Sequence, residues 1–238
     1  MITKTTTDFS KFDFHSGEII LLDKPFGWTS FKVIYKIRKA IEVKKVGHAG
    51  TLDPLATGLL IVCTGKKTKE IASFQNLEKT YTGTILLGKT SPSMDLETEI
   101  SSEMYLKNFS EDEIFKVRDS FLGTISQVPP MFSAIKRNGK NLYKLARKGK
   151  SVERTPREVF ISKFDIVVNL PEIHFEIKCS KGTYIRVIAD DFGKKLGCGG
   201  LLSSLRRTQI GDYCVNDAFE VDEFITRMSQ TRFLPSEQ

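Results

Sequence analysis

Apolar and polar residues recur along the chain with two different periods, which predicts both strands and helices. Strand-like segments, with β-branched alternation or a short apolar run, lie at residues 18–22, 59–63, 79–88, 158–168, 173–179 and 202–210. Segments with a helical period lie at residues 30–41, 67–74, 110–122, 141–148, 184–196 and 221–227. The two kinds are mixed without a strict strand–helix–strand rhythm. The predicted fold class is therefore α+β, with a largely antiparallel mixed sheet flanked by helices.

Several residues indicate where the predicted helices begin and end. Ser30 is a plausible N-cap for the first helix, and Ser110 with Glu113 has the spacing of a capping box. Gly197 follows the helix predicted at 184–196 and is a suitable stop. The strands around residues 169–172 are expected to pair as a hairpin.

The length of 238 residues allows one domain with a modest insertion. Residues 1–17 lack the apolar segment of a signal peptide and contain no arginine, so we expect a loosely held leader. Residues 18–238 are then predicted to form a single domain. No apolar run approaches the roughly 20 residues that cross a bilayer. We therefore expect a cytoplasmic protein that does not bind membranes.

The sequence contains no recognisable cofactor motif. The four cysteines include no CxxC pair, and none of the three histidines has zinc-ligand spacing to a cysteine or another histidine. Between Gly58 and Gly65 lie six residues where a P-loop has four. Residues 197–202 end in leucine where a dinucleotide fingerprint requires glycine. We expect neither a metal nor a nucleotide cofactor.

Positive charge is concentrated in one segment of a chain whose net charge is +7. Residues 136–157 contain nine lysines and arginines and a single acid, Glu153. The basic residues are Lys136, Arg137, Lys140, Lys144, Arg147, Lys148, Lys150, Arg154 and Arg157. A solvated helix face is the simplest interpretation of a few such charges. Nine against one favours a surface that follows a phosphate backbone.

Residues 46–58 place His48, Asp53 and two threonines among three glycines, between two well-patterned elements. Pro54 disfavours the α region for Asp53 and would present its carboxylate from an extended backbone. An Asx-type turn is an equally acceptable interpretation of an Asp-Pro pair. No other acid lies between Glu42 and Glu70. A lone aspartate does not suit a two-carboxylate glycoside hydrolase but suits a nucleophile or a partner for a developing glycosyl cation.

Residues 47–58, Gly-His-Ala-Gly-Thr-Leu-Asp-Pro-Leu-Ala-Thr-Gly, resemble the signature of the TruB-type tRNA pseudouridine synthases, which modify the uridine of the T-loop. Further motifs of that family follow in order at residues 23–25, 79–81, 133–136, 179–186 and 205–207. The resemblance implies a pseudouridine-synthase-like catalytic domain. It also implies isomerisation of uridine to pseudouridine at position 55 of tRNA, by aspartate-dependent cleavage of the glycosidic linkage and its re-formation through C5.

The resemblance also implies roles for individual residues. Asp53 matches the catalytic aspartate, Arg186 matches the arginine that pairs with it, and Tyr81 matches the tyrosine that stacks on the flipped base. Without the family, Tyr81 would be interpreted as one partner of a cross-strand aromatic pair. Tyr184 and Leu205 match residues that line the base pocket. His48 matches the histidine that occupies the place of the target base in the RNA.

The basic segment matches a thumb-like insertion, at about residues 124–157, that grips the T-arm of tRNA. The substrate-binding residues expected in it are Lys136, Lys144, Arg147 and Lys148. Two features depart from the family. Pro92 stands where the first of two acids is usual, so that only Asp95 is kept, and residues 212–238 are too few for a separate C-terminal RNA-binding domain.

We expect the chain to act as a monomer on the T-arm. Two other functions compete with this prediction. One is a non-catalytic RNA-binding module, against which the joint presence of Asp53, Tyr81 and Arg186 argues. The other is a pseudouridine synthase directed at a different RNA.

Overall fold

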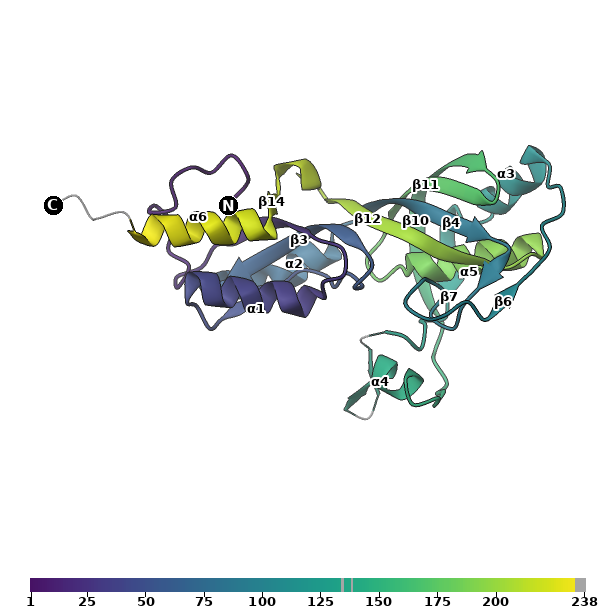
Figure 1. Cartoon of the computed structure of the whole chain (residues 1–238), viewed down its shortest axis with the longest axis horizontal. Helices are drawn as coiled ribbons and strands as arrows, with labels where there is room; N and C mark the ends of the chain where they lie inside the picture. Colours follow the sequence, from purple (N-terminus) through teal and green to yellow (C-terminus); the bar gives the residue numbers. More distant parts are fainter. Residues whose placement is uncertain (134, 138, 234–238) are drawn as a thin grey trace. The chain divides into compact units, whose positions relative to one another are not determined.

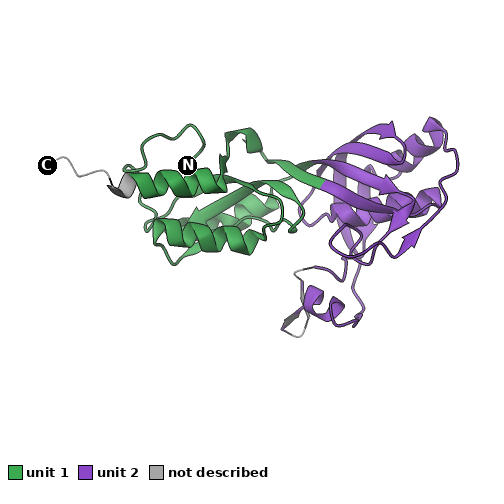
Figure 2. Ribbon diagram, in the orientation of Figure 1, with its two compact units in different colours: residues 1–81, 205–238 green, residues 82–204 purple. Residues whose placement is uncertain are grey.

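A computed structural model describes residues 1–133, 135–137 and 139–233 of the chain (Figure 1). The chain forms two compact units (Figure 2). Unit 1 comprises Met1–Tyr81 and Leu205–Gln238, and unit 2 comprises Thr82–Ser204. Whether both units act as the single domain expected over residues 18–238 stays a prediction.

Two strands contain residues of both units. They are β4 (Lys79–Leu87) and β12 (Gly200–Ile210). The strands predicted at 79–88 and 202–210 are confirmed, and their observed ends differ from the predicted ones by at most two residues. The chain leaves unit 1 along β4 and returns to it along β12.

Unit 1 is built on a mixed sheet with the strand order β14 (Phe219–Glu220), β1 (Ile19–Lys24), β3 (Thr57–Thr64) and β12. β1 and β3 are antiparallel and remain in register over all six residues of β1. β12 runs parallel to β3, and a short strand, β2 (Val46–His48), pairs antiparallel with β3. This pairing places the end of β2 at the start of the loop that carries Asp53, and Arg206 and Arg207 of β12 beside the end of that loop.

Helices cover both faces of this sheet. Alternate residues of β1 and β3, including Ile20 and Val62, pack with α1 (Ser30–Ile41) and α6 (Val221–Phe233), which lie side by side in Figure 1. The intervening residues pack with Phe74 of α2 (Ile71–Asn76). Burial on both faces explains why β3 is a continuous apolar run rather than an alternating one.

The expectation of a loosely held leader at residues 1–17 is wrong. Ile2, Phe9 and Phe14 are buried in the core with α1 and α6, and Ile2 forms a bridge to Ile20. Burial of three large apolar side chains stabilises this segment on the sheet. These residues are scattered without a period, so no pattern in the sequence predicted their burial.

Unit 2 has the strand order β12, β4, β11 (Glu172–Cys179), β10 (Arg157–Asn169) and β7 (Gly123–Gln127). The predicted hairpin is confirmed, since β10 and β11 pair antiparallel. β7 was not predicted as a strand. Because it pairs with β10, the residues outside the sheet begin after Gln127 and not at about 124.

The core of unit 2 contains a cluster of aromatic rings beneath α5 (Ile185–Leu196). Phe192 of α5 stacks on Phe121 with 5.9 Å between ring centroids and meets Phe164 of β10 edge-on at 6.1 Å. Gly197 ends α5 in the left-handed conformation, as expected. The mixed, mostly antiparallel sheets with helices against them confirm the α+β fold class.

The remaining elements are short. They are α3 (Glu111–Asp119), α4 (Leu142–Ala146), β5 (Lys89–Thr90), β6 (Ser102–Glu103), β8 (Lys136–Arg137), β9 (Lys140–Asn141), β13 (Tyr213–Cys214) and the 3-10 helices η1 (Gly65–Glu70) and η2 (Val215–Asp217). The capping box at Ser110 and Glu113 is present at the start of α3. The helix predicted at 67–74 is divided between η1 and α2.

The N-cap of α1 is Thr29 and not Ser30. The Thr29 hydroxyl accepts a hydrogen bond from the backbone amide of Lys32, which satisfies one free N–H of the first turn. Ser30 becomes the first helical residue, and its buried hydroxyl is available for a different contact.

Candidate active site and nucleic-acid interface

The loop that carries Asp53 lies in unit 1 between β2 and β3, and buried side chains fix its backbone on both sides of the aspartate. The Ser30 hydroxyl donates to the Leu52 carbonyl at 3.1 Å and accepts from the Leu52 amide at 2.9 Å. The Lys24 ammonium donates to the carbonyl oxygens of Trp28 at 2.6 Å and Pro54 at 3.3 Å. Residues 52 and 54 are therefore both anchored, and Asp53 projects from a fixed segment.

A third anchor comes from β12. Arg207 is 1% exposed, and its guanidinium donates to the carbonyl oxygens of Leu59 at 2.8 Å and Gly50 at 3.1 Å. These two residues lie on either side of Asp53 in the sequence. One buried side chain thus bridges the start and the end of the loop, and five donor positions on a rigid fork make arginine suited to this task.

The loop itself turns directly after Asp53. The backbone amide of Ala56 donates to the carbonyl oxygen of Asp53 at 3.1 Å, which closes a four-residue turn. This is a turn closed by the backbone, and the Asx-type turn, which would use the Asp53 side chain, stays a prediction. Asp53 is itself only half-buried, and a carboxylate that is fixed at its backbone but reachable from solvent can act on a bound substrate.

The buried ammonium of Lys24 lies near this carboxylate within unit 1. Burial lowers the pKa of Lys24 to about 8, and the negative charge of Asp53 opposes that shift. The Lys24 ammonium thus lies near the Asp53 carboxylate, and it also holds the neighbouring backbone by hydrogen bonds. Lys24 was part of a family motif in the sequence but was not predicted as a site residue, because a lysine before proline is typical of an exposed turn.

His48 lies on β2, opposite Val62 of β3. Burial lowers the pKa of its imidazole, and the nearby positive charge of Arg207 lowers it further. The ring is therefore neutral near pH 7. Its Nδ1 atom is buried, and a hydrogen bond to the backbone of Gly50 raises the pKa against these two larger effects.

Leu205 and Tyr81 lie on the two strands that leave unit 1. Leu205 precedes Arg206 of β12, which lies opposite Thr57 at the end of the Asp53 loop. Arg206 forms an ion pair with Asp23, at 2.5 Å between Nη2 and Oδ2. Tyr81 is a half-buried residue of β4, the neighbour of β12. Unit 1 thus presents Asp53, His48, Leu205 and Tyr81 on adjacent strands and their connecting loop.

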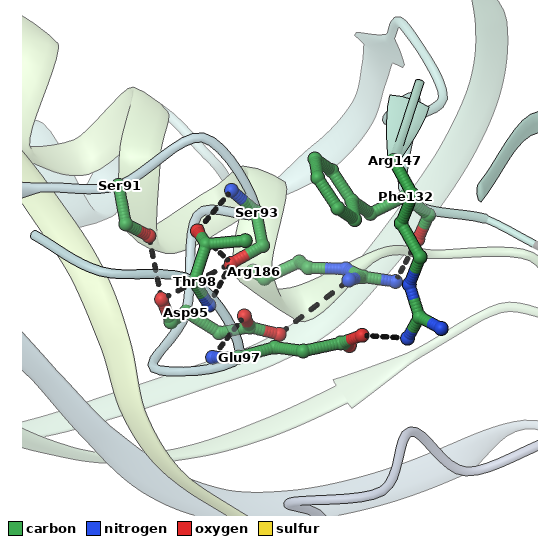
Figure 3. A network of polar contacts seen from close by, with 8 residues as sticks. All are labelled: Ser91, Ser93, Asp95, Glu97, Thr98, Phe132, Arg147 and Arg186. Carbon is green, nitrogen blue, oxygen red and sulfur yellow. Dashed lines mark hydrogen bonds and ion pairs between the residues drawn. The ribbon is translucent and has the colours of Figure 1, made fainter. Parts of the chain in front are cut away.

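Arg186 and Tyr184 belong to unit 2. Arg186 is the second residue of α5, and its side chain is 3% exposed. Its guanidinium donates to the Phe132 carbonyl at 2.7 Å and forms an ion pair with Asp95 at 3.4 Å (Figure 3). The predicted pairing of Arg186 with Asp53 stays a prediction. Asp95 as a buried partner of Arg186 was not expected from the sequence, where it appeared only as the acid that the family motif keeps.

Asp95 is itself held by its own loop. Its Oδ1 atom accepts from the backbone amide of Glu97 at 3.0 Å, and its carbonyl oxygen accepts from the hydroxyls of Ser91 and Ser93 (Figure 3). The ring of Tyr184 lies near two cations, with the guanidinium of Arg157 at 4.7 Å and that of Arg186 at 5.9 Å from its centroid. The loop at 91–98 therefore positions Arg186 at the start of α5.

The basic insertion presents its charges to solvent. Lys144, Arg147, Lys148 and Lys150 are all exposed. Arg147 forms an ion pair with Glu97 at 2.8 Å, which neutralises part of its charge. Lys136 lies in β8, and its side chain is outside the described part of the structure. Exposure agrees with a phosphate-binding surface and equally with a solvated face.

The described residues contain no group of three or more His, Cys, Asp or Glu placed to hold a metal ion. No helix among them is long and apolar enough to cross a membrane.

Comparison with known families gives two matches that together cover most of the chain. Residues 38–185 match the model of the TruB family pseudouridylate synthase N-terminal domain. Residues 186–232 match the model of the tRNA pseudouridylate synthase B C-terminal domain. That second match falls on the end of unit 2 and on the returning part of unit 1.

Curated relatives are similar over nearly their whole length. The tRNA pseudouridine synthase B of Flavobacterium johnsoniae is 48% identical over 220 residues, which cover 89% of this chain and 96% of the relative. That of Chloroherpeton thalassium is 48% identical, with 90% and 92% covered. Among solved structures, a chain of a Cbf5-Nop10-Gar1 complex has a TM-score of 0.68 at 26% identity. The match covers 90% of this chain and 54% of that one.

Proposed function

Because the chain belongs to the TruB family of pseudouridylate synthases, we propose that it isomerises uridine to pseudouridine in the T-loop of tRNA, at position 55. The observation that carries the proposal is the Asp53 loop. In this loop the backbone on both sides of Asp53 is fixed by buried Lys24 and Ser30, and Arg207 bridges the residues before and after it. Such fixation is what a reaction at a single glycosidic carbon requires.

The reaction is redox-neutral. The bond between N1 and C1′ breaks, the uracil turns, and a bond forms between C5 and C1′, while the proton on C5 is lost and N1 regains one. Asp53 acts on the ribose–base linkage in this scheme. Because the target atom is inaccessible in a stacked loop, the nucleotide must first be extruded, at a cost of a few kcal/mol.

The remaining residues have supporting roles in the proposal. Tyr81 stacks on the extruded base, which returns about 1–3 kcal/mol. Neutral His48 occupies the place that the base leaves. Tyr184 and Leu205 line the base pocket. Arg186 acts on Asp53 from a position that Asp95 and the Phe132 carbonyl define.

The exposed basic insertion supplies contacts to the RNA backbone. Its members in the proposal are Lys136, Lys144, Arg147 and Lys148. We expect the protein to work as a monomer in the cytoplasm, on the T-arm of tRNA, and without a metal or nucleotide cofactor.

The direct test is release of tritium from an unmodified tRNA transcript labelled at C5 of its uridines, followed by mapping of the modified position. Stoichiometric release of one tritium per tRNA and modification at position 55 are expected. Release with modification elsewhere would identify a different RNA substrate. Tight RNA binding with no release would favour a non-catalytic RNA-binding module and contradict the proposal.

A further inference from the structure

The outer face of α1 combines aromatic rings with lysines and has no part in the site proposed above. Phe31, Lys32, Tyr35, Lys36 and Lys39, which we call the α1 surface, are all exposed. Phe31 is 70% exposed and Tyr35 is 48% exposed, although large aromatic side chains are usually buried. The opposite face of the helix packs in the core of unit 1, so the helix needs none of these rings for its own packing.

The charge of the α1 surface is not neutralised. Residues 24–41 contain no acid. In the described structure no carboxylate forms an ion pair with Lys32, Lys36 or Lys39. Some exposed lysines elsewhere are paired, such as Lys11 with Asp8, Lys163 with Glu176 and Lys194 with Asp190, whereas others, such as Lys66 and Lys69, have no ion pair among the described residues. Three unpaired cations on one helix face complement a polyanion.

The aromatic residues are spaced to receive flat groups. Phe31 and Tyr35 are four residues apart and so lie on the same side of the helix, about 6 Å apart along its axis. Lysine and aromatic residues alternate there, with Lys32 over the Trp28 ring at 4.0 Å and Lys39 over the Tyr35 ring at 4.9 Å. Exposed rings next to cations are the usual means of binding unpaired nucleotides, whose bases have free π-faces.

The α1 surface begins beside the Asp53 loop. The amide of Gly27 donates to the Pro54 carbonyl at 2.9 Å, and Ser30 exchanges two hydrogen bonds with Leu52. From this junction the twelve residues of α1 extend about 18 Å. RNA whose target nucleotide lies at Asp53 can therefore continue onto the helix.

We propose that the α1 surface binds an unpaired stretch of RNA next to the target nucleotide. Bases stack on Phe31 and Tyr35, and phosphates contact Lys32, Lys36 and Lys39. The identity of the RNA rests on the proposed function, whereas its unpaired state follows from the rings themselves. A second copy of the chain is a poorer occupant, because a two-fold interface would bring two sets of unpaired lysines together.

The test uses the whole protein and two RNA probes, a 12-nucleotide oligouridine and a 12-base-pair RNA duplex. Phe31→Ala with Tyr35→Ala removes the rings and keeps the charge. This double variant is expected to bind oligouridine at least about fivefold more weakly, the lower end of the loss for one stacked base, and to bind the duplex like the wild type. A triple variant removes the charge, with Lys32→Gln, Lys36→Gln and Lys39→Gln. It should reduce the slope of the logarithm of the binding constant against the logarithm of salt concentration by roughly 0.7 for each phosphate that it no longer neutralises.

The matched control replaces three ion-paired, exposed lysines, as Lys11→Gln, Lys163→Gln and Lys194→Gln, and should leave affinity and slope unchanged. The proposal is overturned if the wild type does not bind oligouridine, if the ring variant binds it unchanged, or if the duplex loses as much affinity as the single strand. It is also overturned if the variants alter sedimentation and not RNA binding, which would identify a protein interface. None of these outcomes depends on tritium release from tRNA, so failure of the proposed function is a separate result.

Discussion

Arg186 and Asp95 form a buried ion pair in unit 2, with 3.4 Å between Nη1 of the arginine and Oδ2 of the aspartate. Their side chains are 3% and 8% exposed. The arginine is held a second time by the Phe132 carbonyl, and the aspartate by the Glu97 amide. A guanidinium with two fixed acceptors is held in one orientation, and the role proposed for Arg186 depends on a fixed side chain.

Asp95→Asn should lower the single-turnover rate of pseudouridine formation by about 100-fold, because a small misplacement of a catalytic group has effects of that size. It should also lower the free energy of unfolding by about 3 kcal/mol, since it removes a counter-ion from a buried charge. Urea unfolding and rapid-quench kinetics measure the two effects.

Two further variants complete this test. Glu97→Gln, the matched control in the same loop, breaks the ion pair with Arg147, whose side chain is 63% exposed, and should cost less than about 1 kcal/mol. Arg186→Lys keeps the charge of the buried pair but replaces a fork of donors by a single, more strongly hydrated ammonium. Its rate should fall by about 100-fold at nearly unchanged tRNA affinity. Wild-type turnover in Arg186→Lys would mean that the Arg186–Asp95 pair has no positioning role. Equal effects of Asp95→Asn and Glu97→Gln on the single-turnover rate would mean the same.

Asp53→Asn should abolish turnover and leave tRNA affinity nearly unchanged. The two side chains have almost the same shape, but the amide of asparagine has no negatively charged oxygen that could react. Affinity is measured by filter binding and turnover by tritium release under single-turnover conditions. Measurable pseudouridine formation would remove Asp53 from the centre of the mechanism.

The sequence predicted those parts of the fold that depend on local patterns. Such patterns are the apolar stripe of α1 and the alternation of apolar residues in β10 and β11. The capping box of α3 is also local, because its two residues are three positions apart. The burial of Ile2, Phe9 and Phe14 could not be predicted, because isolated apolar residues in a polar segment have no period. β2 was missed for a similar reason, since three residues that include a glycine are too few to show alternation.

From the residues alone, the candidate site could be recognised only where one stretch of sequence contains it, and Tyr81, Arg186 and Leu205 came from the family resemblance. The Asp53 loop lies within twelve residues and could be identified as a whole. The residues that anchor it could not, because Arg207 lies on a strand that returns from unit 2 and Lys24 has the local context of an exposed turn. The Arg186–Asp95 pair joins residues 91 positions apart, a distance that no local pattern spans.

The pH dependence of stability should report the burial of Lys24. Its pKa is lowered from 10.5 to about 8 in the folded protein, so between these values the unfolded chain binds more protons. Stability therefore rises with pH in this window, by at most about 1.4 kcal/mol per pH unit, and the cost of the buried charge is fully present below pH 8.

Lys24→Met isolates this effect from other titrations. Burial raises the pKa of the Cys63 thiol to about 11, which acts in the opposite direction above pH 9 but is common to both proteins. The unfolding free energy of the wild type minus that of Lys24→Met should increase between pH 7 and pH 10 in urea titrations. A constant difference would show that Lys24 keeps an ordinary pKa in the folded state.

Neutralising the basic insertion should weaken tRNA binding and flatten its salt dependence. Lys144→Gln, Arg147→Gln, Lys148→Gln and Lys150→Gln are expected to lower the log–log slope by roughly 0.7–0.9 for each phosphate that is left without its cation. Arg147 should contribute least, because Glu97 already neutralises it. Charge-neutral variants of the ion-paired lysines, Lys163 and Lys194, serve as the control. An unchanged slope would identify the insertion as a solvated face.

The close contact between the Asp53 loop and β12 can be tested with two glycines that share a positive φ. Gly58 has φ +106°, and a Cβ atom there would lie 2.2 Å from the Arg207 carbonyl oxygen. Gly27 has φ +76°, with nothing within 4 Å of its Cβ position. Gly27→Ala should therefore cost only the backbone strain, about 1–2 kcal/mol. Gly58→Ala must also push β12 away from β3, so we expect a loss of more than about 3 kcal/mol or failure to fold.

Where Gly58→Ala still folds, its single-turnover rate should fall far more than that of Gly27→Ala, because displacement of Arg207 releases its hydrogen bonds to Gly50 and Leu59. Urea unfolding of both variants gives the stability difference, and tritium release at saturating tRNA gives the rate. If the two alanine variants are equally stable, β12 does not press against the loop at Gly58. If Gly58→Ala is destabilised but turns over like the wild type, the bridge made by Arg207 stabilises the fold without positioning Asp53.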